Sequence, residues 1–295
     1  MRKNWMVVVA LVCVISLIGG CIAHKVNLEE SEKEITTKGP KETATESDVD
    51  VTTDPIVEET TTEETTTKGA KEKNIDPNKW MVALTFDDGP YTDGRTDKIV
   101  DVCEANPGTA VTFFHLGDRM KTHVELVQRE EAVGCEVGAH SMSHKRLTEL
   151  SLADLQKDFE NQQAVFQEIL GHDITVYRPP YGRFDDNVKT YVKAPLIIWT
   201  VDTLDWKYDN TQKLIDTIQK EAENGGLDGK VVLMHETKQS TADAMETIIP
   251  WLVEQGYQVV TVSDLAEYGF GEKLEAGKSY GYKFFVNRDL GSSGD

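Results

Sequence analysis

The chain has 295 residues and a formal net charge of −20 at pH 7. This acidic balance excludes nucleic acid as a partner, because a polyanion would be repelled and the sequence has no basic stripe with interleaved aromatic residues. No aromatic residue falls between Trp5 and Trp80, whereas Trp, Tyr and Phe recur regularly from Trp80 onward. We therefore expect one folded domain of about 190 residues, long enough to bury a core, behind an N-terminal tail.

The N-terminus indicates export. Arg2 and Lys3 precede a short apolar run, residues 5–18, and the run closes with Ile18-Gly19-Gly20-Cys21. A basic start, a short apolar segment and small residues are typical of a signal peptide, and the run is too short for a secure transmembrane helix. Its end resembles a bacterial lipobox, in which the cysteine is lipidated. We expect residues 1–21 to be a lipoprotein signal peptide with Cys21 as the lipidation site. An uncleaved signal anchor is the alternative, and either places the domain at the extracytoplasmic face of the cell membrane.

Residues 22–75 are dominated by Thr, Glu and Lys, including the run of Glu and Thr at 58–67. Such low-complexity sequence has no periodicity that would build a core. We expect a disordered spacer of about fifty residues, which lets a tethered domain reach well beyond the membrane surface.

From residue 76 onward, short apolar runs alternate with amphipathic segments. The predicted strands are residues 80–86, 109–116, 135–139, 175–178, 196–201, 230–234 and 258–262. The predicted helices are residues 95–105, 123–133, 151–170, 212–223 and 242–255. This alternation indicates an α/β fold with a largely parallel sheet, either open or closed into a barrel, with its catalytic groups at the C-terminal ends of the strands. We assign the catalytic domain to residues 76–272 and a packed C-terminal extension to residues 273–295.

Ionisable side chains do follow the predicted strands. In chain order they are Asp87 and Asp88, His140 and His144, Arg178, Asp202 and Asp205, and His235. A network of charges on one rim with no function would be costly, so this distribution predicts a site. His115 is different, because it lies within the second strand, where alternation favours a core or edge position over metal ligation. Cys103 and Cys135 are compatible with a disulfide in an oxidising compartment and equally with two small buried hydrophobic residues.

Five motifs in this order resemble those of the polysaccharide deacetylase family, also called the NodB-homology or carbohydrate esterase 4 family. They are Thr85-Phe86-Asp87-Asp88-Gly89-Pro90, His140-Ser141-Met142-Ser143-His144, Arg178-Pro179-Pro180-Tyr181-Gly182, Asp202-Thr203-Leu204-Asp205-Trp206 and Leu233-Met234-His235. The resemblance covers residues 80–265 and implies an irregular (β/α) barrel with about seven strands. It also implies a metal-dependent hydrolase of acetylated polysaccharide. One departure is Glu236, where Asp is more usual.

The residue types support a metal site. His140 and His144 stand four apart, so on a helical turn both imidazoles would face one way. Asp88, from another strand end, supplies a third and hard ligand. Three protein ligands leave positions open to water and substrate, as in catalytic sites, and two nitrogens with one oxygen suit Zn²⁺, with Co²⁺ or Mn²⁺ as alternatives.

The resemblance implies further roles around this metal. Asp87, which points away from Asp88 along an extended backbone, would be the general base, held by Arg178 in a bidentate ion pair. His235 would be the general acid, with Asp205 sustaining its charged form. The remaining assignments are the backbone N–H of Tyr181 as oxyanion donor, with Tyr181, Trp206 and Leu233 as substrate-binding residues around the acetyl group.

An anchored deacetylase would meet peptidoglycan as its nearest abundant substrate, so we expect N-deacetylation of N-acetylglucosamine by a monomeric enzyme. Chito-oligosaccharide, poly-N-acetylglucosamine and acetyl-xylan remain open. Some relatives that act on N-acetylmuramic acid carry Asn at the second acid of the first motif, so Asp88 weighs against that group. The competing class is an inactive glycan-binding surface lipoprotein, which predicts loss of motif residues; the essential ones are all present.

Overall fold

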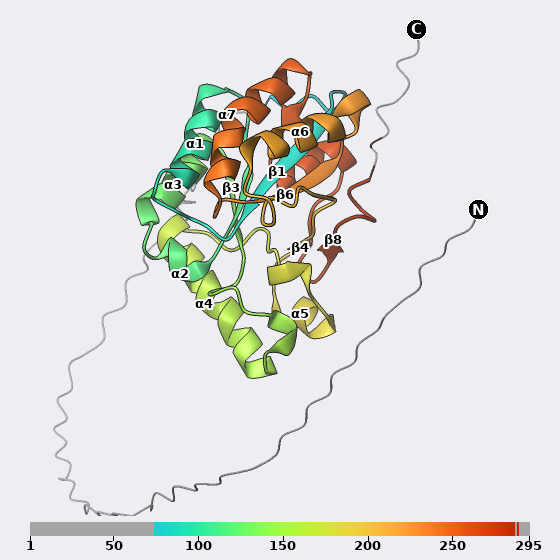
Figure 1. The fold of residues 1–295 in the computed structure, drawn as a ribbon. Coiled ribbons are helices and arrows are strands. Elements are labelled where there is room, and N and C mark those ends of the chain that lie inside the picture. The colour runs from blue at the N-terminus through green and yellow to red at the C-terminus, as the bar shows by residue number, and fades with distance from the viewer. Residues whose placement is uncertain (1–73, 287, 289–295) are drawn as a thin grey trace, which may run out of the picture. The chain divides into compact units, whose positions relative to one another are not determined.

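The computed structural model describes residues 74–286 and residue 288 (Figure 1). The predicted signal peptide, its Cys21 and residues 22–73 of the predicted spacer lie outside the described residues. Within the described part of the chain, no helix combines the length and the apolar content needed to cross a membrane.

The centre of the fold is β1 (Met81–Asp87), all seven residues of which are buried. A strand that is covered on both faces reads as a continuous apolar run, as this one does. β1 pairs in parallel with β6 (Lys230–His235) on one side and with β2 (Thr112–His115) on the other. β3 (Glu136–Ala139) extends the sheet beyond β2, β5 (Val201–Asp202) extends it beyond β6, and β7 (Gln258–Val259) pairs with the start of β1. Since all these pairings are parallel, the carboxyl ends of the strands meet at one rim.

Tyr177 and residues 196–202 together close this sheet into an irregular barrel. Tyr177 bridges Ala139 at the end of β3 and Leu196 at the start of β4 (Leu196–Ile197). Only a few residues further along, β5 pairs with β6 at the opposite edge of the sheet. Residues 196–202 therefore connect Tyr177, which is bridged to the end of β3, with β6 at the opposite edge. The predicted α/β barrel with a parallel sheet is confirmed, with an additional short strand, β8 (Ser279–Tyr280), paired to β4.

The predicted strand at residues 175–178 is wrong in extent, because only Tyr177 makes strand-like bridges. Arg178 is followed by Pro179 and Pro180, which have no N–H to donate and therefore end the pairing. The second predicted strand, 109–116, likewise contracts to β2. Cys103 and Cys135 are both buried free thiols.

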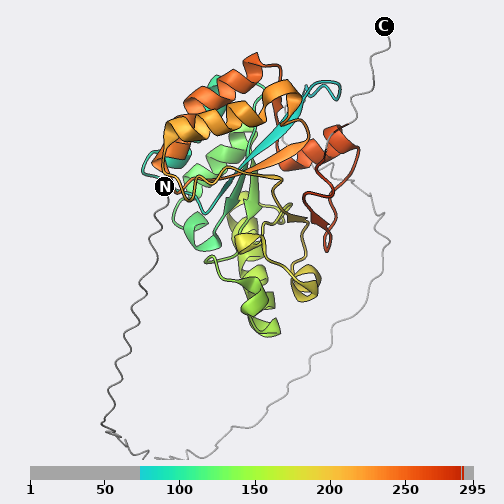
Figure 2. The ribbon, with the colours of Figure 1, turned by 45° about the vertical axis from the view of Figure 1, so that its right-hand side comes forward.

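Helices cover the outside of the sheet. They are α1 (Arg95–Ala105), α2 (Gly117–Met120), α3 (Val124–Val133), α4 (Leu152–Leu170), α5 (Asp186–Tyr191), α6 (Thr211–Glu221), α7 (Gln239–Glu254) and α8 (Val262–Asp264). Short 3₁₀ turns span Leu147–Glu149, Pro180–Gly182 and Glu223–Gly225, and one π-helical turn spans Leu265–Gly269. Neighbouring helices contact one another in the order α6, α7, α1, α3, α4, α5. The orange helices α6 and α7 lie side by side over the sheet in Figure 2.

Alternate side chains of β1 point to opposite faces of the sheet and pack into two different hydrophobic clusters. Val82, Leu84 and Phe86 face the helices α1, α6 and α7, whereas Met81 and Ala83 belong to a second cluster with Phe114 and Val231. Alternation places Thr85 and Asp87 on the same face as Met81 and Ala83. The interior of the barrel is therefore apolar at its amino end and polar at the rim.

The predicted C-terminal extension contributes to the interior cluster. Phe285 is fully buried there, and Tyr280 and the partly buried Phe284 pack with it. The adjacent Val286 is 42% exposed. This segment is thus part of the core and not only a surface tail.

We predict that Phe285→Ala lowers the free energy of unfolding by about 3–5 kcal/mol, because it removes a buried aromatic ring and leaves a cavity. The matched variant Val286→Ala, on the exposed neighbour, changes it by less than about 0.5 kcal/mol. Urea unfolding followed by circular dichroism measures both. Equal effects of the two substitutions would contradict the assignment of Phe285 to the core.

Candidate active site

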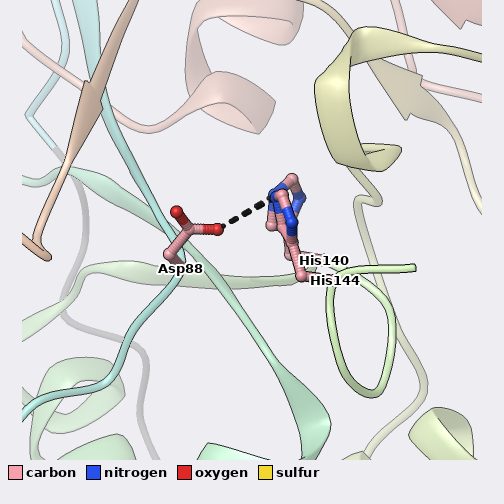
Figure 3. A group of neighbouring side chains, drawn as sticks. All are labelled: Asp88, His140 and His144. Atoms are coloured by element: carbon pink, nitrogen blue, oxygen red, sulfur yellow. Dashed lines mark ion pairs between the residues drawn. The ribbon is translucent and has the colours of Figure 1, made fainter. Parts of the chain in front are cut away.

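Three predicted metal ligands converge at the rim. The Oδ1 atom of Asp88 lies 3.5 Å from Nε2 of His140 and 3.3 Å from Nε2 of His144. Figure 3 shows the two imidazoles together on one side of the carboxylate. One ligand atom from each residue lies within 4.8 Å of the other two. Among the described residues, Asp88 Oδ1 is a buried oxygen with no hydrogen-bond donor.

This arrangement fits a divalent metal ion. A buried carboxylate oxygen with no donor is costly unless a cation neutralises it. Two imidazole nitrogens and one carboxylate oxygen form a common ligand set for such ions, and three protein ligands leave coordination positions for water and substrate. The donor set therefore describes a catalytic metal centre, whose ion it does not specify.

The backbone turns sharply between the two aspartates. Asp87 is the last residue of β1, and Asp88 adopts a left-handed conformation with φ of 77°. The Asp88 N–H donates a hydrogen bond to the carbonyl oxygen of Phe114 at 3.2 Å. Aspartate tolerates this backbone conformation better than most residues. The turn allows Asp87 to face the barrel interior while Asp88 faces the two histidines.

The two histidines lie on a turn, so the predicted helical placement is wrong. Ser141 and His144 have φ values of 66° and 59°, and an α-helix cannot continue through left-handed residues. The His144 N–H donates to Ser141 Oγ at 2.9 Å, which closes the turn. The four-residue spacing still brings both Nε2 atoms to Asp88, because the chain folds back on itself.

A hydrogen bond orients the ring of His140. Its Nδ1 lies 2.6 Å from the carbonyl oxygen of Arg178, to which it donates, leaving Nε2 as the metal-facing acceptor. Burial lowers the pKa of His140, and this effect outweighs the opposing charges of Asp87 and Asp88. The neutral imidazole that a metal requires is therefore the favoured form.

Arg178 holds Asp87 inside the barrel. Its Nη1 donates to Asp87 Oδ1 at 2.7 Å and to Thr85 Oγ1 at 2.8 Å, and its guanidinium lies 4.0 Å from the centre of the Phe114 ring. The predicted bidentate pairing is wrong, because only Nη1 of Arg178 binds the Asp87 carboxylate, through Oδ1, and the same nitrogen also binds Thr85 Oγ1. Burial alone would raise the pKa of Asp87, but the charge of Arg178, together with that of His235 and the hydrogen bond from Arg178, lowers it below its usual value. Asp87 is thus an ionised carboxylate, with Oδ2 located 3.7 Å from His140 Nε2.

His235 ends β6 directly beside Asp87 in the strand register. Its Nδ1 and its backbone N–H both donate to Asp205, at 2.8 and 2.7 Å, and Thr241 Oγ1 donates to the same carboxylate at 2.8 Å. Burial lowers the pKa of His235, but the hydrogen bond and charge of Asp205, with smaller contributions from Asp87 and Asp88, raise it to about 9. His235 is therefore a protonated imidazolium at neutral pH, held opposite the ionised Asp87.

The remaining predicted residues lie around these pairs. Tyr181 is half-exposed in a left-handed conformation with φ of 61°, and its ring centre is 4.6 Å from that of His144. Trp206 is half-exposed, whereas Leu233 is buried within β6. Asp202, which the sequence left without a role, accepts hydrogen bonds from Leu204 N and Trp206 Nε1 at 2.9 and 3.3 Å, so it stabilises the turn.

Sequence reasoning missed two features beside the site. The first is Thr85, whose hydroxyl accepts a hydrogen bond from Arg178. Thr85 lies two residues before Asp87, so strand alternation alone could have placed both side chains on the same face. His115 is fully buried between Glu130 and Glu236. Burial lowers the pKa of His115, but those two carboxylates raise it to about 10. Only the fold brings these three residues together, so no sequence signal indicated the group.

Comparison with known proteins agrees with this geometry. Residues 74–196 match the polysaccharide deacetylase family. The chain is 40% identical over 197 residues to the peptidoglycan-N-acetylmuramic acid deacetylase PdaC of Bacillus subtilis. It is 38% identical over 200 residues to the peptidoglycan-N-acetylglucosamine deacetylase PgdA of Listeria monocytogenes. These alignments cover 67% and 68% of this chain and 41% of each relative, so the chain spans about two fifths of their length.

The solved structure of PdaC from Bacillus subtilis superposes with a TM-score of 0.62 at 39% identity, covering 66% of this chain and 93% of that one. Because this similarity extends over nearly the whole of the solved domain, the chain belongs to the polysaccharide deacetylase family.

Proposed function

We propose that this protein is a metal-dependent hydrolase that removes the acetyl group from N-acetylglucosamine residues of peptidoglycan. The observation that carries the proposal is one rim that holds a three-ligand metal site, an ionised Asp87 and a protonated His235. Hydrolysis of an amide needs a base for the attacking water and an acid for the leaving nitrogen, and the site has one of each.

Asp88, His140 and His144 would hold the metal, which we assign as Zn²⁺, with Co²⁺ or Mn²⁺ able to substitute. When bound, the ion supplies Lewis-acid chemistry, lowering the pKa of water and polarising the acetyl carbonyl. The second nitrogen of His140 is fixed by the Arg178 carbonyl, so the ligand ring is oriented before the ion arrives.

The protein's own groups move the protons. Asp87 takes a proton from the attacking water as the new carbon–oxygen bond forms, and Arg178 keeps this base ionised and in place. His235 gives its Nε2 proton to the sugar nitrogen as the carbon–nitrogen bond breaks, yielding acetate and a free amine. Asp205 keeps His235 protonated and oriented. We assign the developing oxyanion to the backbone N–H of Tyr181, and the acetyl methyl to a pocket walled by Trp206 and Leu233.

The relatives support peptidoglycan as the polymer, but they do not distinguish which of its two acetylated sugars is the substrate. One relative is named for N-acetylmuramic acid and the other for N-acetylglucosamine. We propose N-acetylglucosamine, since Asp88 keeps the carboxylate of the first motif where some N-acetylmuramic acid deacetylases carry Asn.

We further propose that the protein acts as a monomer tethered by a lipid on Cys21, with residues 22–75 as its spacer. The catalytic domain would begin at residue 76, whose N–H and carbonyl oxygen both bind the side chain of Gln258 at 2.8 and 2.7 Å.

The first prediction is that the purified protein releases acetate from peptidoglycan. A chelator abolishes this release, and Zn²⁺ restores it, because the three ligands are preassembled around the cation position. Mass spectrometry of the digested glycan identifies the deacetylated sugar. Loss of acetyl from N-acetylmuramic acid alone would contradict the assigned sugar, and binding of glycan with no acetate release would indicate the inactive lipoprotein instead.

Two aspartate variants serve as controls for this prediction. Asp87→Asn removes the base without removing a metal ligand, so it should lose roughly 10²- to 10⁴-fold in kcat while Zn²⁺ affinity is retained. Asp202→Asn keeps the oxygen that accepts from Leu204 and Trp206, so its kcat should stay close to wild type. Equal activity of Asp87→Asn and wild type would exclude the proposed mechanism.

The pH profile provides a second prediction. Because His235 must be protonated, kcat falls as pH rises through its pKa, which Asp205 raises to about 9. Asp205→Asn removes the negative charge, so the alkaline limb of kcat should move at least about one pH unit lower. Thr241→Val removes only a hydrogen bond to Asp205 and should leave the limb near its original position. An unchanged limb in Asp205→Asn would rule out His235 as the acid.

The anchor gives a third prediction. In cells that process lipoproteins, the wild-type chain should partition with membranes and incorporate a labelled fatty acid. Cys21→Ser should carry no label, because it offers no thiol for the lipid, whereas Cys13→Ser in the apolar run should remain labelled. Label on the Cys21→Ser protein would contradict lipidation at this position.

A further inference from the structure

A group of buried ionisable side chains lies beside the loop that carries Asp87 and Asp88. It consists of Glu130 on α3, His115 on β2 and Glu236 directly after β6, and the side chains of all three are inaccessible to solvent. Nε2 of His115 is 2.7 Å from Glu130 Oε2, and its Nδ1 is 3.2 Å from Glu236 Oε1. We call these three residues the buried ion group.

The buried ion group is costly for folding. Two carboxylates and an imidazole removed from water lose hydration that their mutual attraction only partly replaces, and apolar residues of similar volume are often as stable. None of the three belongs to the metal site or to the proton-transferring pairs. Their burial therefore indicates a purpose other than stability.

Glu236 contacts the loop in three ways. Its backbone N–H donates to the carbonyl oxygen of Asp87 at 3.3 Å. Its Oε2 accepts a hydrogen bond from Thr96 Oγ1, which itself accepts from the N–H of Tyr91 at 2.9 Å. Its carboxylate also lies directly against Gly89: a Cβ atom at that position would be 1.9 Å from Glu236 Cδ. The loop is thus bound at both ends and enclosed in the middle.

His115 connects the same group to the other ligand-bearing segment. Its backbone carbonyl accepts the N–H of His140 at 2.8 Å, and the next residue, Leu116, donates its N–H to the carbonyl of Gly89 at 3.0 Å. The end of β2 therefore contacts both the Asp88 loop and the start of the histidine turn. A shift of His115 would move both segments that supply the metal ligands.

We propose that Glu236, fixed by His115 and Thr96, is a positioning residue that holds the loop from Asp87 to Tyr91 so that Asp88 Oδ1 faces the two histidines. It touches neither substrate nor metal, and its side chain acts through its contacts with Gly89 and Thr96. The effect on catalysis rests on the proposed function, whereas the effect on metal binding does not.

Zn²⁺ affinity of the full chain, measured by competition with a chromogenic chelator, tests the proposal. Glu236→Gln and Glu236→Ala should weaken Zn²⁺ binding roughly 10- to 100-fold, as is typical when a group that orients a ligand is removed. The matched control is Asp228→Asn, two residues before the amino end of β6. Asp228 is also a buried carboxylate, accepting from Met81 N and Arg288 Nη1 at 2.8 and 2.9 Å, but it precedes the amino end of β6, whereas Glu236 follows the carboxyl end. Its loss should lower stability and leave Zn²⁺ affinity unchanged.

A double-mutant cycle separates positioning from general destabilisation. Gly89→Ala alone should weaken Zn²⁺ binding, because its Cβ collides with the Glu236 carboxylate and displaces the loop. In the Glu236→Ala background the collision is absent, so adding Gly89→Ala should cost little further affinity. If Glu236→Ala fails to fold, Glu236→Gln still reports on the orienting role.

Zn²⁺ affinity of Glu236→Gln equal to that of Asp228→Asn, or fully additive effects in the cycle, would overturn the proposal. A wild-type chain that binds Zn²⁺ but releases no acetate would instead reject the proposed function and leave the positioning role intact.

Discussion

The ion pair between Arg178 and Asp87 is the constraint on which the site depends. The guanidinium of Arg178 is inaccessible to solvent. Its Nη1 donates to Asp87 and Thr85 at 2.7 and 2.8 Å and its Nε donates to the carbonyl of Ile197 at 3.3 Å, while its Nη2 has no hydrogen-bond partner among the described residues. These partners come from β1 and β4, on different sides of the barrel. The backbone carbonyl of Arg178 also orients His140. One buried residue therefore fixes the proposed base and one metal ligand together.

The two adjacent aspartates show how local backbone geometry divides two chemical tasks. Asp87 continues the strand and faces the interior, where positive charge keeps it ionised. Asp88 leaves the strand in a left-handed conformation and turns its oxygen to the histidines. A regular strand would also direct neighbouring side chains to opposite faces, but it would send Asp88 toward the helices and not toward the rim. The loop that follows therefore needs support, which the buried ion group beside Gly89 is placed to give.

The opposite charges of Asp87 and His235 at the rim depend on the pairing of the strands that carry them. β1 and β6 are in register at Asp87 and His235. Arg178 lowers the pKa of one, and Asp205 raises the pKa of the other, so a base and an acid coexist at neutral pH. Each charge is held by a buried counter-charge, Arg178 at 0% and Asp205 at 2% exposure, which leaves the reactive atoms free to face the rim. The register of β1 and β6, more than any single motif, places Asp87 and His235 side by side.

The sequence by itself determined the alternation of strands and helices, the rim position of the ionisable groups and the identity of the three candidate ligands. These features are local or periodic, and hydrophobic patterning and motif spacing report them directly. It could not reveal that Ser141 and His144 adopt left-handed conformations, or that Arg178 Nη1 binds both Asp87 Oδ1 and Thr85 Oγ1. It also did not indicate that Phe285 is the residue of the packed C-terminal extension that is buried in the core. Nor could it place His115 between Glu130 and Glu236. Tertiary structure decided these, because each depends on contacts between segments that are distant in the chain, where packing overrides local preference.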